Sequence, residues 1–300
     1  MHRILTAAAI AALIPISGAA QAPDPLVVSQ DWLAAHLHDA NLVLLQVGTE
    51  ETYKRGHIPG ARFADWMNFH TMSSDPKALT LEMPPPEEIR SALEALGISN
   101  GSHVVVYASD EYWSPSTRVV LTLDYAGLTN VSYLDGGLQA WTAAAHPVST
   151  EVASATRGTL APLTIKPIIV DAAFVQAHAK TPGFAIVDAR AASFYDGVQA
   201  GGQRGGPKKL GHIPGAVSAP FDEFADGDGK LKSPADIKAL FDKAGVKPTD
   251  TVIGYCHVGQ QATAMLFAAR TLGHPVLLYD GSFEDWARRD LPVELPAGKK

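Results

Sequence analysis

The sequence contains a single cysteine, Cys256, in 300 residues. One cysteine cannot form an intrachain disulfide, and without a spaced histidine or cysteine partner it does not make up a set of metal ligands. We therefore expect no disulfide framework, no metal site and no bound cofactor.

The sequence also lacks an excess of positive charge and a long apolar run. Its net charge of −7 argues against nucleic acid or an anionic membrane surface as the main partner. No stretch approaches the roughly 18 apolar residues that a transmembrane helix needs. The composition is that of a soluble globular protein, and a chain of 300 residues predicts about two domains.

The beginning of the chain has the pattern of a secretory signal peptide. Arg3 is followed by an apolar stretch that extends to Ile16, and small residues precede Pro23. We expect residues 1–22 to be a signal peptide, cleaved after Ala20 or Ala22. The mature protein is then exported, and we expect a periplasmic location.

The rest of the chain contains the same pattern twice. The hexapeptide GHIPGA occurs at residues 56–61 and again at 211–216. The block "EEIRSALEALGISNGSHVVVY" matches "ADIKALFDKAGVKPTDTVIGY" at an offset of 148 residues, and "LDGGLQAW" matches "YDGSFEDW" at an offset of 145. Matched blocks in one order indicate a duplicated domain.

Short apolar runs alternate with helical patterns in each half. We expect strands at 42–47, 104–107 and 131–134, and at 185–188, 252–255 and 275–279. The intervening segments "PEEIRSALEALG" and "SPADIKALFDKAG" carry helix start and stop signals. This alternation predicts an α/β fold of two tandem domains, each a mostly parallel sheet flanked by helices. The expected divisions are a signal peptide at 1–22, a first domain at 23–147, a linker at 148–162 and a second domain at 163–300.

The two copies differ where chemistry is expected. At one strand end the second copy has Asp188 and Arg190, whereas the first has Gln46 and Gly48. At the next strand end the second copy has Cys256, and the first has alanine. A cysteine that only packs in a core has no reason to occur together with a carboxylate and a guanidinium, so we interpret Cys256 as a nucleophile.

The segment "CHVGQQ" leads from a strand into a helix, with Gly259 allowing a tight turn. Successive backbone N–H groups and the helix N-terminus would face the sulfur and stabilise the thiolate. A protonated His257 would add positive charge. The sequence thus predicts a lowered pKa for the Cys256 thiol.

These motifs resemble the tandem rhodanese family of thiosulfate and 3-mercaptopyruvate sulfurtransferases. GHIPGA in both halves, "VDAR", the ending "YDGSFEDW…DLPVE" and the cysteine loop carry the resemblance. It implies two rhodanese-like domains, of which the first is inactive and the second catalytic. It also implies a Cys256 persulfide, formed from a small anionic sulfur donor and discharged to a thiol or cyanide.

The resemblance also implies roles for the residues around the cysteine. Arg190 would hold the donor anion, with Asp188 orienting the strand end or pairing with Arg190. The loop amides of the five residues after the cysteine would stabilise thiolate and persulfide; these are His257, Val258, Gly259, Gln260 and Gln261.

The donor is less clearly indicated. Thiosulfate enzymes tend to carry basic residues after the cysteine and mercaptopyruvate enzymes carry Gly-Ser, whereas this chain has His257 and Val258. Mercaptopyruvate enzymes also use an arginine at a position that is Phe194 here. We expect a thiosulfate sulfurtransferase. The alternatives are a 3-mercaptopyruvate sulfurtransferase, or a persulfide carrier or binding module that does not turn over. A monomer is expected.

The second copy carries about 13 additional residues between Tyr195 and Gly211. One interpretation is a surface loop, given its glycines. The other is that Arg204, Lys208 or Lys209 reaches the cysteine and supplies positive charge, with Arg204 the first choice. A cysteine phosphatase is disfavoured, because such an enzyme needs an arginine about six residues after the cysteine, and this position is occupied by Ala262.

Overall fold

The computed structural model describes residues 25–296 apart from residues 72, 111, 203–205 and 228. The predicted signal peptide and Arg204 therefore lie outside the described residues. No helix within the described ranges is long and apolar enough to cross a lipid bilayer.

The first half forms a five-stranded parallel sheet in the order β1-β5-β4-β2-β3. Its strands are β1 (Val27–Val28), β2 (Leu42–Val47), β3 (Arg62–Ala64), β4 (His103–Ala108) and β5 (Val131–Leu134). Its helices are α1 (Gln30–His36), α2 (Glu50–Arg55), α3 (Pro86–Ala95), α4 (Ser114–Tyr125), α5 (Gly137–Ala143) and the 3₁₀ helix η1 (Trp66–Phe69).

The second half repeats this sheet in the equivalent order β10-β7-β11-β12-β6, again all parallel. Its strands are β6 (Ile169–Val170), β7 (Phe184–Asp188), β10 (Val217–Ser218), β11 (Thr251–Tyr255) and β12 (Val276–Tyr279). Its helices are α6 (Ala172–His178), α7 (Ala192–Tyr195), α8 (Pro234–Ala244), α9 (Ala262–Thr271), α10 (Ser282–Arg288) and the 3₁₀ helix η2 (Phe221–Phe224).

The helices begin and end where the local sequence requires it. In α8, the Ser233 side chain caps the first turn by accepting the N–H of Asp236, and Pro234 occupies the first helical position. Gly245 ends the helix in the left-handed conformation, with φ of 88°. Helix α3, the counterpart of α8 in the first half, likewise starts at a proline and has Glu87 and Glu88 in its first turn.

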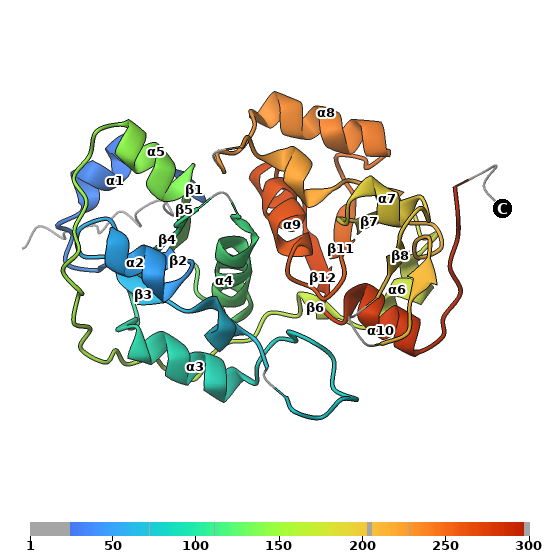
Figure 1. The fold of residues 1–300 in the computed structure, drawn as a ribbon, viewed down its shortest axis with the longest axis horizontal. Helices are drawn as coiled ribbons and strands as arrows, with labels where there is room; N and C mark the ends of the chain where they lie inside the picture. The colour runs from blue at the N-terminus through green and yellow to red at the C-terminus, as the bar shows by residue number, and fades with distance from the viewer. Residues whose placement is uncertain (1–24, 72, 111, 203–205, 228, 297–300) are drawn as a thin grey trace, which may run out of the picture.

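The two halves meet along α4 and α9, which lie side by side in the middle of the molecule (Figure 1). Both helices are buried over most of their length, as expected for helices that pack on all sides. The largest apolar cluster contains residues of both halves, among them Val106, Leu121, Val252 and Leu266. The two domains therefore share this cluster, and each half has a further cluster of its own.

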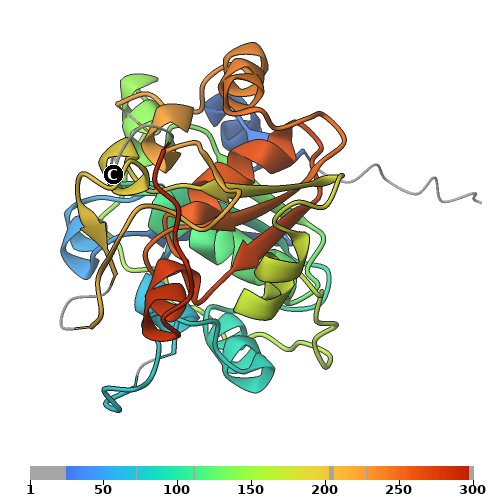
Figure 2. The ribbon, with the colours of Figure 1, turned by 90° about the vertical axis from the view of Figure 1, so that its right-hand side faces the viewer.

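Two hydrogen bonds cross between the halves at equivalent places. Asp280, after β12, accepts the backbone N–H of Met83 at 2.5 Å, and Asp135, after β5, accepts the backbone N–H of Leu231 at 2.8 Å. Met83 and Leu231 stand at the same position in the two copies, as do Asp135 and Asp280. The segment of the first half that carries Met83 extends beside α10 of the second half (Figures 1 and 2).

The insertion in the second half contains a short antiparallel hairpin of β8 (Ala200–Gly201) and β9 (Lys209–Leu210). Lys209 Nζ forms an ion pair with Asp290 at 2.8 Å and donates a hydrogen bond to the carbonyl of Leu291 at 2.5 Å. The insertion is thus packed against the segment that follows α10.

Candidate active site

Cys256 follows β11, the central strand of the second sheet, at the carboxyl end where ligands bind in parallel sheets. Its side chain is completely buried. Its backbone N–H donates to Ser282 Oγ at 3.1 Å, and its carbonyl accepts the N–H of Phe283 at 3.1 Å. The start of α10 therefore holds the cysteine in place.

The loop after the cysteine surrounds the sulfur with backbone donors. The N–H groups of Val258, Gly259, Gln261 and Ala262 donate to it and lower the pKa of the Cys256 thiol. Gly259 has φ of 82°, the left-handed conformation that turns the loop back on itself. Three of the five predicted amides, those of Val258, Gly259 and Gln261, are among these donors. The fourth donor, Ala262, was not predicted, although its place at the first residue of α9 signals a free N–H.

Burial raises the pKa of the Cys256 thiol by more than these donors lower it, so the net shift is upward. The predicted lowering of this pKa is therefore wrong for the free protein. Its physical reason is that burial of the thiol costs the thiolate its hydration, which fixed N–H dipoles replace only in part.

His257 does not supply the predicted charge. Burial and the neighbouring Arg190 lower the pKa of its imidazole to about 4, so the ring is neutral at pH 7. The ring lies edge-on to Phe194, with 4.5 Å between the ring centroids. Phe194 and His257 therefore form an uncharged, aromatic wall beside the cysteine loop.

Arg190 and Asp188 form a fully buried ion pair at the end of β7, with 2.6 Å between Nη2 and Oδ2. Nε of Arg190 donates to the same carboxylate at 2.9 Å, and Nη2 also donates to the carbonyl of Gly211. The hydroxyl of Tyr255 donates to Asp188 at 2.7 Å. Asp188 therefore fixes both the arginine and the strand that precedes the cysteine.

One nitrogen of Arg190 is left for another partner. Its Nη1 has no hydrogen-bond partner among the described residues. The guanidinium carbon lies 3.9 Å from the centroid of the Phe283 ring, and Gly201 of the β8–β9 hairpin packs so closely that a Cβ there would lie 2.2 Å from Nη1. The insertion thus covers Arg190, which the sequence did not indicate.

The other predicted residues are placed as follows. Gln260 is buried and its Nε2 has no partner within the described ranges, whereas Val258 and Gln261 are half-buried. Lys209 is engaged by Asp290, so its charge is neutralised there rather than at the cysteine. Lys208 is exposed.

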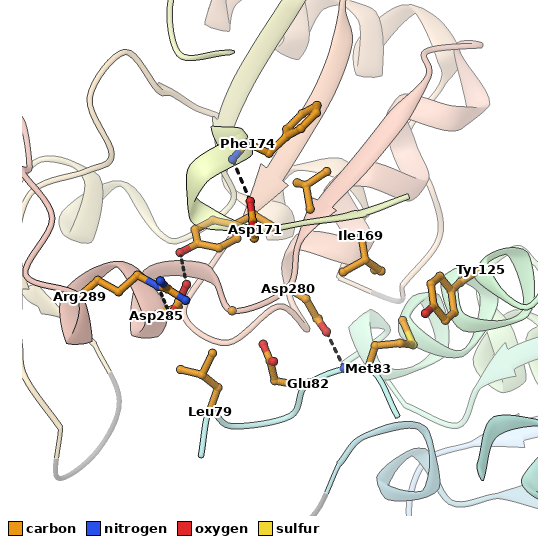
Figure 3. Close-up of a pocket in the computed structure, with 13 residues that line it drawn as sticks. Leu79, Glu82, Met83, Tyr125, Ile169, Asp171, Phe174, Asp280, Asp285 and Arg289 are labelled. Carbon is orange, nitrogen blue, oxygen red and sulfur yellow. Dashed lines mark hydrogen bonds and ion pairs between the residues drawn. The ribbon is translucent and has the colours of Figure 1, made fainter. Parts of the chain in front are cut away.

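A separate cavity of about 510 Å³ lies between the two halves and does not include Cys256. Figure 3 shows the carboxylates of Glu82, Asp280 and Asp285 and the guanidinium of Arg289 around it. Burial, together with the nearby carboxylates of Asp280 and Asp285, raises the pKa of Glu82 to about 7. Sequence reasoning gave no sign of this group.

Comparison with known proteins identifies the repeated unit. The family model described as Rhodanese-like domain matches the chain twice, at residues 29–144 and 171–289. A thiosulfate sulfurtransferase of Azotobacter vinelandii is 32% identical over 273 residues, which cover 90% of this chain and 97% of that protein. The sulfur carrier protein TtuD of Thermus thermophilus is 31% identical over 271 residues, 87% of this chain and 93% of that protein.

A solved structure agrees with the fold described above. The crystal structure of SseA from Escherichia coli, described as a 3-mercaptopyruvate sulfotransferase with the rhodanese fold, superimposes with a TM-score of 0.75 at 28% identity. The match covers 86% of this chain and 99% of that one. The predicted α/β fold of two tandem rhodanese-like domains is confirmed. The duplicated sheet, the family match in both halves and the similarity over nearly the whole chain together place this protein in the rhodanese family of sulfurtransferases.

Proposed function

We propose that this protein transfers a sulfane sulfur from thiosulfate to a thiol or cyanide through a persulfide on Cys256. The observation that carries this proposal is the cradle of backbone N–H groups around the sulfur, from Val258 to Ala262. Fixed dipoles aimed at one atom stabilise negative charge wherever it develops on that atom. The Cys256 sulfur carries such charge as the attacking thiolate and again when it leaves the persulfide.

The reaction proceeds in two displacements. The Cys256 thiol first loses its proton to solvent, and the thiolate attacks the outer sulfur of thiosulfate. A new sulfur–sulfur bond forms, the bond to the sulfonate group breaks, and sulfite leaves with the electron pair. Cyanide or a thiolate then attacks the outer sulfur of the persulfide, which gives thiocyanate or a new persulfide and returns the Cys256 thiolate.

Arg190 fits the role of donor anchor. Its Nη1 is the one guanidinium nitrogen not engaged by Asp188 or Gly211 among the described residues. A charge-assisted hydrogen bond from it to a sulfonate oxygen would orient the donor. Phe194 stands where a mercaptopyruvate enzyme would carry a further arginine, and this favours thiosulfate over 3-mercaptopyruvate.

Intact mass spectrometry tests the proposal. After incubation with thiosulfate the protein should gain one sulfur atom, lose it on addition of cyanide, and show no gain in the Cys256→Ser variant. If the protein gains a sulfur atom with 3-mercaptopyruvate and none with thiosulfate, 3-mercaptopyruvate is the donor instead. No gain with either would overturn the persulfide mechanism.

A persulfide carrier is the second candidate. A Thermus thermophilus relative at 31% identity is named a sulfur carrier protein, and the raised pKa of the free Cys256 thiol is compatible with slow turnover. Steady-state turnover with thiosulfate and cyanide separates the two, because a carrier that needs another protein as acceptor is labelled once and then stops.

Export and a monomeric state are further parts of this proposal. They are supported by the signal-like residues 1–22 and by the shared core that the two halves already form with each other. The mass of the protein secreted to a bacterial periplasm and its sedimentation coefficient check them. A full-length intracellular product or a concentration-dependent dimer would contradict them.

A further inference from the structure

Arg118 belongs to the half without a cysteine, yet its side chain contacts the cysteine loop. It extends from α4 and is fully buried in the interface between the halves. Its Nη1 lies 2.5 Å from Asp280 Oδ1 and 3.5 Å from the carbonyl oxygen of Gly259. Its Nη2 donates to the carbonyl of Leu81 at 3.1 Å.

Gly259 contacts both Arg118 and the sulfur of Cys256. Its N–H donates to Cys256, while its carbonyl faces Arg118. The space on its other side is filled by Asp280, since a Cβ at Gly259 would lie 2.5 Å from the Asp280 carbonyl oxygen and 2.6 Å from Oδ1. Asp280 and Arg118 therefore both lie against Gly259, the residue whose N–H faces the sulfur.

The internal repeat shows that this arrangement is one-sided. Asp280 and its counterpart Asp135 each accept a backbone N–H from the opposite half. The residue of α9 that corresponds to Arg118 is Leu266, which packs against Gly254 of its own sheet. The buried arginine thus contacts the copy that has the cysteine, whereas its counterpart leucine contacts a strand of its own half.

Burying an ion pair is an expensive way to hold two domains together. The desolvation of both charges offsets most of their attraction, and apolar replacements of similar volume are often equally stable. The position equivalent to Arg118 in the second half holds leucine, so the repeat forms no second pair of this kind there. Unlike leucine, a guanidinium offers several hydrogen-bond donors that are held in a fixed plane.

We propose that Arg118 is a positioning residue for sulfur transfer, acting through Asp280 and the Gly259 peptide on the N–H groups that face the Cys256 sulfur. Its charge is neutralised by Asp280, so it acts through geometry. The half without a cysteine thereby supplies a part of the active site. The inference rests on the proposed function, in that the effect is expected on Cys256 chemistry.

The test compares a double variant with unchanged net charge, made at the Arg118–Asp280 pair, with a single substitution at the place equivalent to Asp280 in the other half. Arg118→Met combined with Asp280→Asn removes both charges together, which avoids a buried unpaired carboxylate, and the remaining side-chain oxygen can still accept the N–H of Met83 (Figure 3). Asp135→Asn is the matched control in the other half. We expect the double variant to lower kcat about tenfold to hundredfold, with the KM for thiosulfate changed less. It should also raise the pH midpoint of Cys256 alkylation, whereas the control should change neither quantity.

A folded double variant with wild-type kcat and an unchanged alkylation midpoint would overturn the proposal. If the double variant does not fold, Arg118→Lys keeps the pairing with Asp280 but has too few donors in the right plane to reach Gly259 and Leu81 as well. It should then show the same loss of kcat and the same midpoint shift, and wild-type values would again overturn the proposal. The alkylation profile needs no sulfur donor, so it tests Arg118 even if the wild-type protein forms no persulfide and the proposed function fails.

Discussion

The two loops that follow β4 and β11 have the same length and different chemistry. Ala108 and Cys256 each stand six residues before the first residue of the next helix. The additional residues of the first half come later, because α4 has 12 residues and α9 has 10. The loop of the first half is therefore a copy of the same length, with alanine at the position of the cysteine.

The hydrogen bonds of the tyrosine near the end of β4 and of β11 are also similar in the two copies. Tyr107 donates to Gln46 and accepts the N–H of Ile58, as Tyr255 donates to Asp188 and accepts the N–H of Ile213. In both cases a tyrosine ties the strand end to the GHIPGA turn. The copies thus share these tyrosine hydrogen bonds and differ in the residues that form the buried ion pair.

A side chain at the position equivalent to Arg190 would collide with Ser109 in the first half. A Cβ at Gly48, the counterpart of Arg190, would lie 1.8 Å from Ser109 Oγ. An arginine there would require Ser109 to move. The difference between the copies therefore lies in packing as well as in residue type.

The largest expected effect comes from exchanging the thiol between the copies. Cys256→Ser should abolish sulfur transfer with little loss of stability, because the two side chains have nearly the same volume. Adding Ala108→Cys to that variant should not restore activity, since Gln46 and Gly48 stand where the second half has the Asp188–Arg190 ion pair. Thiosulfate–cyanide turnover and thermal unfolding check both statements. Activity of the variant that carries both substitutions would break the comparison.

Loss of the guanidinium should have the next largest effect. Arg190→Ala removes the donor anchor and leaves Asp188 buried without its partner. We expect the KM for thiosulfate to rise about tenfold to hundredfold, the range expected for one charge-assisted hydrogen bond. Steady-state kinetics on protein shown to be folded measures this. An unchanged KM would remove Arg190 from the donor site.

The pH dependence of Cys256 alkylation shows which effect on the thiol pKa is larger, that of burial or that of the N–H donors. Because burial raises the pKa of free Cys256, its alkylation by iodoacetamide should accelerate with pH up to a midpoint above that of an ordinary thiol. His257, with a pKa of about 4, should add no inflection near neutrality. Glutathione under the same conditions is the reference. A midpoint below that of glutathione would show that the N–H donors dominate.

The smallest expected effect concerns Glu82, whose counterpart in the second half is Lys230. The pKa of Glu82 rises from 4.5 to about 7 on folding, so the folded protein holds this proton more tightly than the unfolded chain. Stability from this group therefore falls as pH rises between these two values and stays lower above them. Glu82→Gln should raise the Tm by about a few degrees near pH 8 and leave it unchanged near pH 4.

The matched variant Lys230→Gln should not show this pattern in calorimetry. If Glu82→Gln stabilises the protein equally at both pH values, the gain does not come from the carboxyl proton, and the pKa of Glu82 is not the cause.

Much of the fold could be predicted from local patterns. The six expected strands are present to within a residue at each end, because buried parallel strands are continuous apolar runs. The strands of two or three residues were not predicted, since so few residues carry no periodicity; these are β1, β3, β6, β8, β9 and β10. The place of Cys256 at a strand end also followed from local pattern.

The rest of the site depends on contacts between distant segments. Arg118 and Gly259 are 141 residues apart in the chain, and no local pattern relates them. The direction of the Cys256 pKa shift depends on how completely the loop is buried, and the position of the β8–β9 hairpin over Arg190 depends on packing against Phe283. Sequence patterns supply the parts of such a site, and tertiary packing sets their energies.

The reciprocal bonds of Asp280 with Met83 and of Asp135 with Leu231 have the form of an isologous interface, in which two identical surfaces face each other across a two-fold axis. In a homodimer, any residue placed at such an axis is present twice. Fusion of both copies into one polypeptide removes that constraint. It allows arginine at one position of the interface and leucine at its counterpart, so that one copy can become a dedicated support for the other.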